Sequence, residues 1–105
     1  MIQSVTTSDN KTIKLTTDKR IKRDAIRILR TIKPEIGKIY ADTRKKGIRY
    51  KIAENRSFRM NIQDKQALVV KLNNLYMRAG VNAIAYIHQE QNGFKRERVC
   101  VLIKK

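Results

Sequence analysis

The amino-acid sequence predicts a single α+β domain, in which antiparallel β-hairpins form a sheet or wing-like arms and two or three helices pack on one face. Two kinds of periodicity predict this class. Apolar and polar residues alternate in several short runs, which is typical of half-buried strands. In two longer runs the apolar residues recur at helical spacing. The chain has 105 residues, the length of one domain, so residues 1–105 are expected to fold as a unit.

Two short β-prone runs open the chain, at residues 2–6 and 12–15. The polar residues from Ser8 to Lys11 favour a turn between them. The expected structure is a hairpin or an edge strand. Its free edge makes a homodimer possible, although nothing in the sequence requires one.

The first helix is expected over residues 18–33, where Thr17 can cap its N-terminus and Pro34 ends it. Lysine and arginine residues cover much of its polar side. Its apolar residues fall on one face: Ile21, Ala25, Ile28, Leu29 and Ile32. This helix is therefore expected to pack on the sheet and to present a basic surface.

Residues 34–46 have two interpretations. Pro34 at a first helical position and Gly47 just past the end favour a helix. The alternation of Ile39 with Ala41 favours a strand instead. We favour the helix. On either interpretation, a dense basic cluster follows: Arg44, Lys45 and Lys46.

Residues 47–62 predict a second hairpin, because strict alternation occurs in two runs joined by a polar segment. Pairing Ile52 with Phe58 and Tyr50 with Met60 places the large apolar side chains on one face. Like charges then lie opposite each other on the other face, at a cost of up to about 1 kcal/mol, which favours an anion in front of it. The candidate contact residues of this hairpin and its loop are Arg49, Lys51, Arg56, Arg59 and Asn61.

The last part of the chain predicts a helix and then a long hairpin. The helix is expected over residues 64–79, with Gly80 as its left-handed cap. Asn92-Gly93 is a strong signal for a two-residue turn, which would pair His88 with Glu97. Residues 88–98 contain a single apolar residue, so they are expected to project as a β-arm. Its candidate contact residues are Lys95, Arg96 and Arg98.

Net charge dominates the functional interpretation. The chain has 25 lysine and arginine residues against 9 acidic ones, a net charge of +16 and a pI near 10.5. Self-repulsion at this level favours a polyanionic partner, nucleic acid above all. A two-stranded ribbon fits the major groove of duplex DNA, and few aromatic residues remain free for stacking on unpaired bases. We therefore expect a non-enzymatic nucleic-acid-binding protein that prefers duplex DNA over RNA, in a regulatory or architectural role.

Three alternatives remain at this stage. The first is an RNA-binding or ribosome-associated protein, and the second is a small basic inhibitor or adaptor that binds an acidic protein. The third is a small metal-independent ribonuclease that uses His88, oriented by Glu97, together with an arginine or a lysine. The sequence contains no catalytic set, cofactor motif or metal-ligand spacing, and its one cysteine, Cys100, is expected to be buried. The sequence shows no membrane-spanning segment or signal peptide, so we expect no membrane partner and a cytoplasmic location.

Overall fold

The computed structural model describes residues 4–7, 10, 12–14, 21–44, 47–54, 58–92 and 94–104. Their elements follow the predicted α+β class: β1 (Ser4–Thr6), β2 (Thr12–Lys14), α1 (Ile21–Ile32), β3 (Ile39–Arg44), β4 (Gly47–Ile52), α2 (Ile62–Ala79), β5 (Ala83–Asn92) and β6 (Phe94–Lys104). The predicted N-terminal hairpin is confirmed, since β1 pairs with β2. The two predicted amphipathic helices are confirmed as α1 and α2. Residues 15–20, which include the expected start of the first helix, lie outside the described residues.

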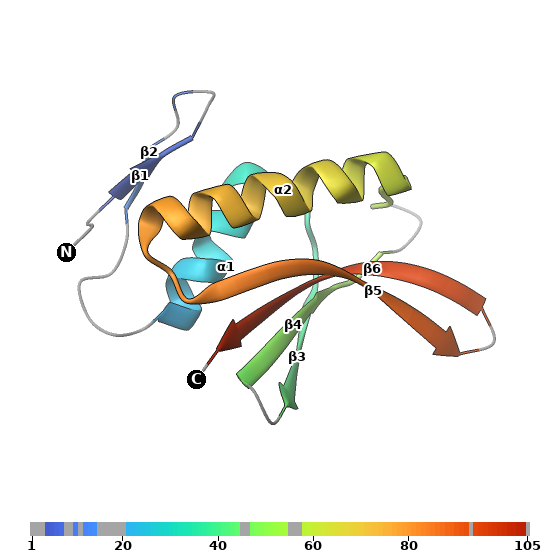
Figure 1. Ribbon diagram of the computed structural model, residues 1–105. Coiled ribbons are helices and arrows are strands. Elements are labelled where there is room, and N and C mark those ends of the chain that lie inside the picture. Colours follow the sequence, from blue (N-terminus) through green and yellow to red (C-terminus); the bar gives the residue numbers. More distant parts are fainter. Residues whose placement is uncertain are drawn as a thin grey trace.

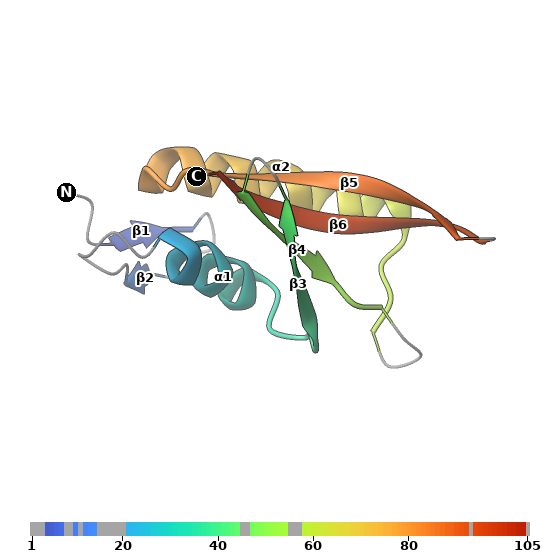
Figure 2. The same ribbon diagram turned by 90° about the horizontal axis from the view of Figure 1, so that it is seen from below.

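The larger sheet is antiparallel and has the strand order β3-β4-β6-β5. Strands β4 and β5 both pair antiparallel with β6, so they run parallel to each other, and α2 is the crossover that connects them (Figure 1). Seen from below, the β5–β6 ribbon lies in front of α2 (Figure 2). Residues of α1 and α2 share one hydrophobic core with Ile52 and Val101 on one face of this sheet, and the opposite face carries Lys51 and Tyr86.

The hydrophobic core lies between the helices and the covered face of the sheet. Val101 on β6 is opposite Ala85 on one side and Tyr50 on the other, and all three belong to or pack against this core. The largest side chains that are fully buried come from both layers: Tyr76, Ile28, Leu29, Ile52 and Leu72. Burying each such aliphatic or aromatic side chain stabilises the fold by about 1.5–3 kcal/mol, so this layer contact is the main source of stability.

The hairpin prediction for residues 47–62 is wrong. Strand β4 pairs with β3 and β6, and Phe58 forms only an isolated bridge. The faces were assigned correctly, because Ile52 faces the core and Lys51 does not, but alternation does not identify the partner strand. The second run is interrupted by Asn61, whose Oδ1 accepts a hydrogen bond from the backbone of Asp64 at 2.8 Å and caps α2.

The favoured helix over residues 34–46 is also wrong, and the alternative strand is the one observed. Strand β3 pairs with β4 from Ile39 opposite Ile52 to Arg44 opposite Gly47. The helical signals at Pro34 and Gly47 are local ones. They are outweighed by ladder hydrogen bonds to β4 and by the packing of Ile39 against the core.

The C-terminal hairpin is confirmed, but its predicted register is wrong by one residue. His88 lies opposite Arg98, and Ala85 lies opposite Val101. Both faces of this ribbon are apolar near its base, so the sequence permits either register. Helix α2 holds β5 at Ala85, because the Asn73 side chain accepts from the Ala85 backbone N–H at 2.7 Å and donates to its carbonyl at 3.0 Å. The small Ala85 therefore lies under the helix.

We expect comparison with the Tyr76→Phe variant to show that the wild type loses stability at high pH through Tyr76. The buried Tyr76 hydroxyl donates to the Ala25 carbonyl at 2.9 Å, so the variant should lose about 1 kcal/mol near neutral pH. Burial raises the pKa of Tyr76 above its ordinary value of 10.0. Above that pH the unfolded chain ionises at this residue and the folded chain does not, which lowers the stability of the wild type alone.

The stability advantage of the wild type over the variant should therefore fall above pH 10.0 by about 1.4 kcal/mol per pH unit, so that it is lost and then reversed towards pH 11. Urea unfolding of both proteins from about pH 8 to pH 11 measures this gap. A gap that stays constant over this range would contradict the assignment.

Candidate nucleic-acid interface

The β5–β6 ribbon extends beyond the four-stranded sheet. Strand β4 pairs with β6 only as far as Cys100, whereas β5 and β6 continue to pair with each other to Asn92 and Phe94. We call residues 88–92 and 94–98 of this ribbon the arm. Figure 1 shows it projecting past the N-terminal end of α2, so the predicted projection of these residues is confirmed.

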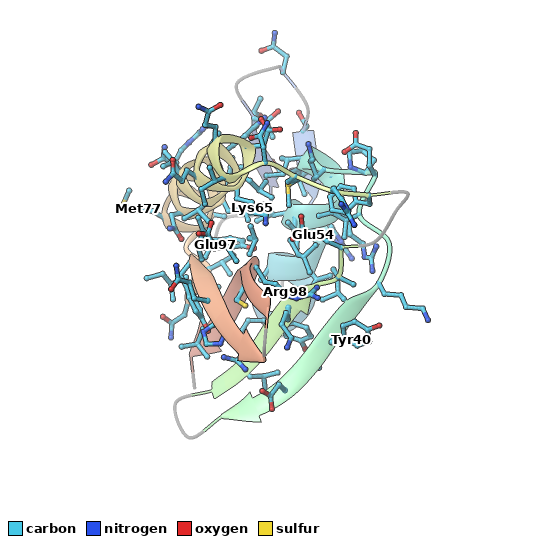
Figure 3. All side chains as sticks on the ribbon, turned by 90° about the vertical axis from the view of Figure 1, so that its right-hand side faces the viewer. Tyr40, Glu54, Lys65, Met77, Glu97 and Arg98 are labelled. Atoms are coloured by element: carbon cyan, nitrogen blue, oxygen red, sulfur yellow. The ribbon has the colours of Figure 1, made fainter. Side chains whose placement is uncertain are left out.

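Lys65 on α2 holds the base of the arm. Its Nζ donates to the Glu97 carbonyl at 2.7 Å and forms an ion pair with Glu54 Oε2 at 3.1 Å. The other oxygen of Glu54 accepts from the Met60 backbone N–H at 2.9 Å. Lys65 is only 9 % exposed, and Figure 3 shows it beside Glu54 and Glu97. This arrangement ties β6, α2 and the segment before α2 to one buried ammonium group.

The arm is also tied to β4. Arg98 lies at the base of the arm, and its Nη1 donates to the carbonyl of Ile52, the last residue of β4, at 3.4 Å. Lys65 of α2 holds β6, and Arg98 of β6 holds the end of β4. These two contacts fix the orientation of the arm relative to the sheet.

The face of the sheet away from the helices, here called the open face, is built in rows across the strands. One row runs from Tyr40 through Lys51 and Cys100 to Tyr86, with each residue directly opposite the next. The adjacent row contains Asp42, Arg49, Leu102 and Ile84. Beyond them, His88 and Arg98 continue the open face into the arm. The arm and the open face therefore form one continuous surface.

Arg49 is the most deeply buried cation of the open face. It is 8 % exposed, and its Nη2 donates to Asp42 Oδ2 at 2.9 Å. Burial lowers the pKa of Arg49, but the neighbouring Tyr86 and Asp42 side chains more than offset this effect and leave the pKa raised. Arg49 therefore carries a permanent charge that is already shared with Asp42.

The structure separates the predicted contact residues into groups. It brings Arg49, Lys51 and Arg98 together on the open face. It does not place Arg59 and Asn61 there, because Arg59 is exposed just before α2 and Asn61 is the helix cap. The remaining predicted residues, or their side chains, lie outside the described part of the structure: Arg44, Lys45, Lys46, Arg56, Lys95 and Arg96.

Two features of this surface were predicted incompletely. Tyr40, which the sequence left as one of the few aromatic side chains free for stacking, is 52 % exposed and points outward from a strand, β3, where a helix was favoured (Figure 3). Lys65 was not identified as a functional residue, although its spacing from Leu68 and Leu72 places it on the buried face of α2. The alternation of Ile39, Tyr40 and Ala41 was the available signal for Tyr40. For Lys65, the available signal was a charged residue at an apolar position of the predicted helix.

Other classes of site find little support in the described residues. Cys100 is fully buried, as predicted, and the described residues contain no group of three or more histidine, cysteine, aspartate or glutamate side chains that could hold a metal. No helix in the described part of the chain is long and apolar enough to cross a membrane. Comparison of the chain with family models, curated proteins and solved structures finds no match.

We expect the Lys65→Met variant to be destabilised by about 3 kcal/mol in urea unfolding. It leaves the Glu54 carboxylate, 15 % exposed, without its cation and the Glu97 carbonyl without its donor. Adding Glu54→Gln should recover much of the loss, because the amide oxygen can still accept from Met60.

Lys33→Met is the matched control for this variant. The Lys33–Glu35 pair spans 3.8 Å at the surface, so its loss should change the stability by no more than about 0.5 kcal/mol. Equal effects of Lys33→Met and Lys65→Met would show that the Lys65 contacts do not hold the arm.

Proposed function

We propose that this protein is a non-enzymatic nucleic-acid-binding protein, with duplex DNA preferred over RNA. The observation that carries the proposal is the braced two-stranded arm, which extends beyond the sheet of a chain with a net charge of +16. Such a ribbon has the dimensions that enter a major groove, where side chains can contact base edges. The basic residues around it would contact phosphates and fix its position.

The distribution of charge supports this proposal. Two of the nine acidic residues, Asp42 and Glu54, pair with Arg49 and Lys65, which are themselves buried. With 25 lysine and arginine residues against nine acidic ones, the chain keeps a large excess of positive charge, which is available to a polyanion.

No catalytic role is proposed for His88. In the ribonuclease alternative, Glu97 was the predicted cross-strand partner that would orient His88, but the residue opposite His88 is Arg98. A neighbouring cation does not orient an imidazole as a general base.

We expect binding to duplex DNA to weaken steeply with salt. If the chain neutralises about six phosphates, the slope of log K against log salt should be near −5. Fluorescence anisotropy with a labelled duplex measures this slope, and a single strand and a structured RNA at matched salt are the comparisons. Absence of binding to all three near physiological salt would overturn the proposal.

Charge reversal tests the arm itself. The Lys95→Glu/Arg96→Glu variant should weaken duplex binding at least tenfold and reduce the salt slope by about two. The control is Lys33→Glu/Lys38→Glu, which makes the same change in net charge between α1 and β3. If both variants weaken binding equally, the attraction is a property of total charge and the arm has no special part in it.

A second candidate, binding to RNA or to unpaired strands, is favoured by one observation. Tyr40 is half exposed on the open face and lies directly opposite Lys51. An exposed ring beside a cation is a stacking site for a base, and such stacking contributes about 1–3 kcal/mol per base.

Tyr40→Ala distinguishes this second candidate from the first. If unpaired bases stack on Tyr40, the variant should lose about tenfold in affinity for a single strand and little for a duplex. Anisotropy with both ligands provides the measurement, and Tyr40→Phe, which keeps the ring, is the control. Equal affinity of Tyr40→Ala and wild type for the single strand would exclude the stacking role.

A further inference from the structure

Helix α2 carries an uncharged stripe along the whole of its outer side. Its members recur at helical spacing and are all exposed: Gln63, Gln66, Ala67, Val70, Asn74 and Met77. Val70 is 60 % and Met77 76 % exposed, and Figure 3 shows Met77 pointing away from the body. In a chain that is about one-third charged, this is a continuous helical surface without a charge. It is distinct from the arm and the open face.

One flank of the stripe carries charges in a particular order. Asp64, Lys71 and Arg78 lie seven residues apart, so they share one side of the helix, with the acid at the N-terminal end and the cations towards the C-terminal end. Lys71 and Arg78, together with Asn74 and Leu75, line a shallow depression, and Arg78, which is exposed, also donates through Nη2 to the Thr6 carbonyl of β1 at 2.9 Å. An acidic side chain from a partner could be accommodated at this depression.

We propose that the uncharged stripe is the interface of a homodimer, in which α2 packs antiparallel against α2 of a second copy. Asp64 and Arg78 are equidistant from Lys71, so a two-fold axis near Lys71 places Asp64 of each chain opposite Arg78 of the other. The two Lys71 side chains meet near the axis, where their long stems let the ammonium groups diverge. Val70 of each chain then lies close to its counterpart.

The distribution of charge favours this face over the rest of the surface for contact between two copies. Two copies with a net charge of +16 each repel one another, and the repulsion is smallest where facing surfaces are uncharged or complementary. The stripe and its flank meet both conditions. The helix has 18 residues and is about 27 Å long, so the pair would bury on the order of 1,000 Å² in total. An interface of that size is typical of a weak, reversible dimer.

The first test is sedimentation velocity of the full chain after nuclease treatment, so that nucleic acid cannot join two copies. We expect a monomer–dimer equilibrium with a Kd of about 10–300 μM. Association should strengthen with added salt, which screens the repulsion, whereas nucleic-acid binding weakens with salt. A chain that remains monomeric at the highest concentrations overturns the proposal, whatever its affinity for DNA.

Val70→Glu and Met77→Glu test the stripe. Each should weaken self-association at least tenfold, although each lowers the net charge and thereby the repulsion between copies. Ile84→Glu is the matched control, because Ile84 is 41 % exposed on the open face and undergoes the same change in charge. Equal effects of the three substitutions, in variants that keep the wild-type melting temperature, would place the interface elsewhere.

Cross-linking tests the antiparallel orientation. A chain with Gln63→Cys is mixed with a chain with Met77→Cys, and a short bismaleimide is added. Antiparallel packing brings residue 63 of one chain near residue 77 of the other, so the mixed dimer should form in excess over either self-dimer. The native Cys100 is fully buried and does not compete. Efficient self-dimers of both variants would indicate parallel packing and contradict the proposal.

Discussion

The position of the arm depends on one buried ammonium group. Lys65 Nζ joins a backbone carbonyl of β6 to the Glu54 carboxylate, and Glu54 in turn holds the segment that leads into α2. Among the described residues, β4 pairs with β6 only as far as Cys100, so β4 does not supply the Glu97 carbonyl with a donor. This carbonyl is partly buried, and leaving a buried carbonyl without a donor costs about 1–3 kcal/mol, a cost that Lys65 reduces. The ribbon can therefore continue beyond the end of β4.

Helix α2 contacts other elements of the fold along its whole length. Its N-terminal part holds the arm through Lys65, and its middle covers the free edge of β5 through the two hydrogen bonds between Asn73 and Ala85. Further along, Tyr76 bonds to α1, and Arg78 donates to the Thr6 carbonyl of β1 at 2.9 Å. An exposed strand edge is a common site of aggregation, and here a helix side chain occupies part of it. The inward sides of α2 are thus engaged with every layer, which leaves its outer side available for another chain.

The sequence predicts the elements and their faces better than their partners. Alternation shows that Ile52 faces inward and Lys51 outward, and helical spacing identifies α1 and α2, because these patterns depend only on local geometry. Pairing depends on what else is buried. Nothing between residues 47 and 62 indicates that β6 lies beside β4. The final hairpin slips by one residue because both faces of its base are apolar and permit either register, and the register adopted places Ala85 opposite Val101 in the core.

In the candidate site, too, the features that depend on local sequence were predicted and those that depend on strand pairing were not. The projection of the arm followed from the scarcity of apolar residues between 88 and 98, since a segment without apolar residues cannot be buried in a core. By contrast, the use of Arg49 as an internal ion-pair partner could not be predicted. It depends on the β3–β4 register that places Asp42 opposite it, in a segment where the helix was favoured. Charged residues on a strand therefore indicate a surface only once their cross-strand neighbours are known.

The two proposed surfaces are compatible because they lie on different sides of the molecule and respond to charge in opposite ways. The arm projects at the N-terminal end of α2, so two antiparallel copies of this helix would carry their arms at opposite ends of the dimer. Contacts with phosphate would attract both arms to one duplex and reduce the repulsion between the copies. Two chains bound to one duplex would each have a high effective concentration near the other, so the polyanion would strengthen a weak dimer. Under this arrangement, the excess charge that opposes self-association in solution favours it on DNA.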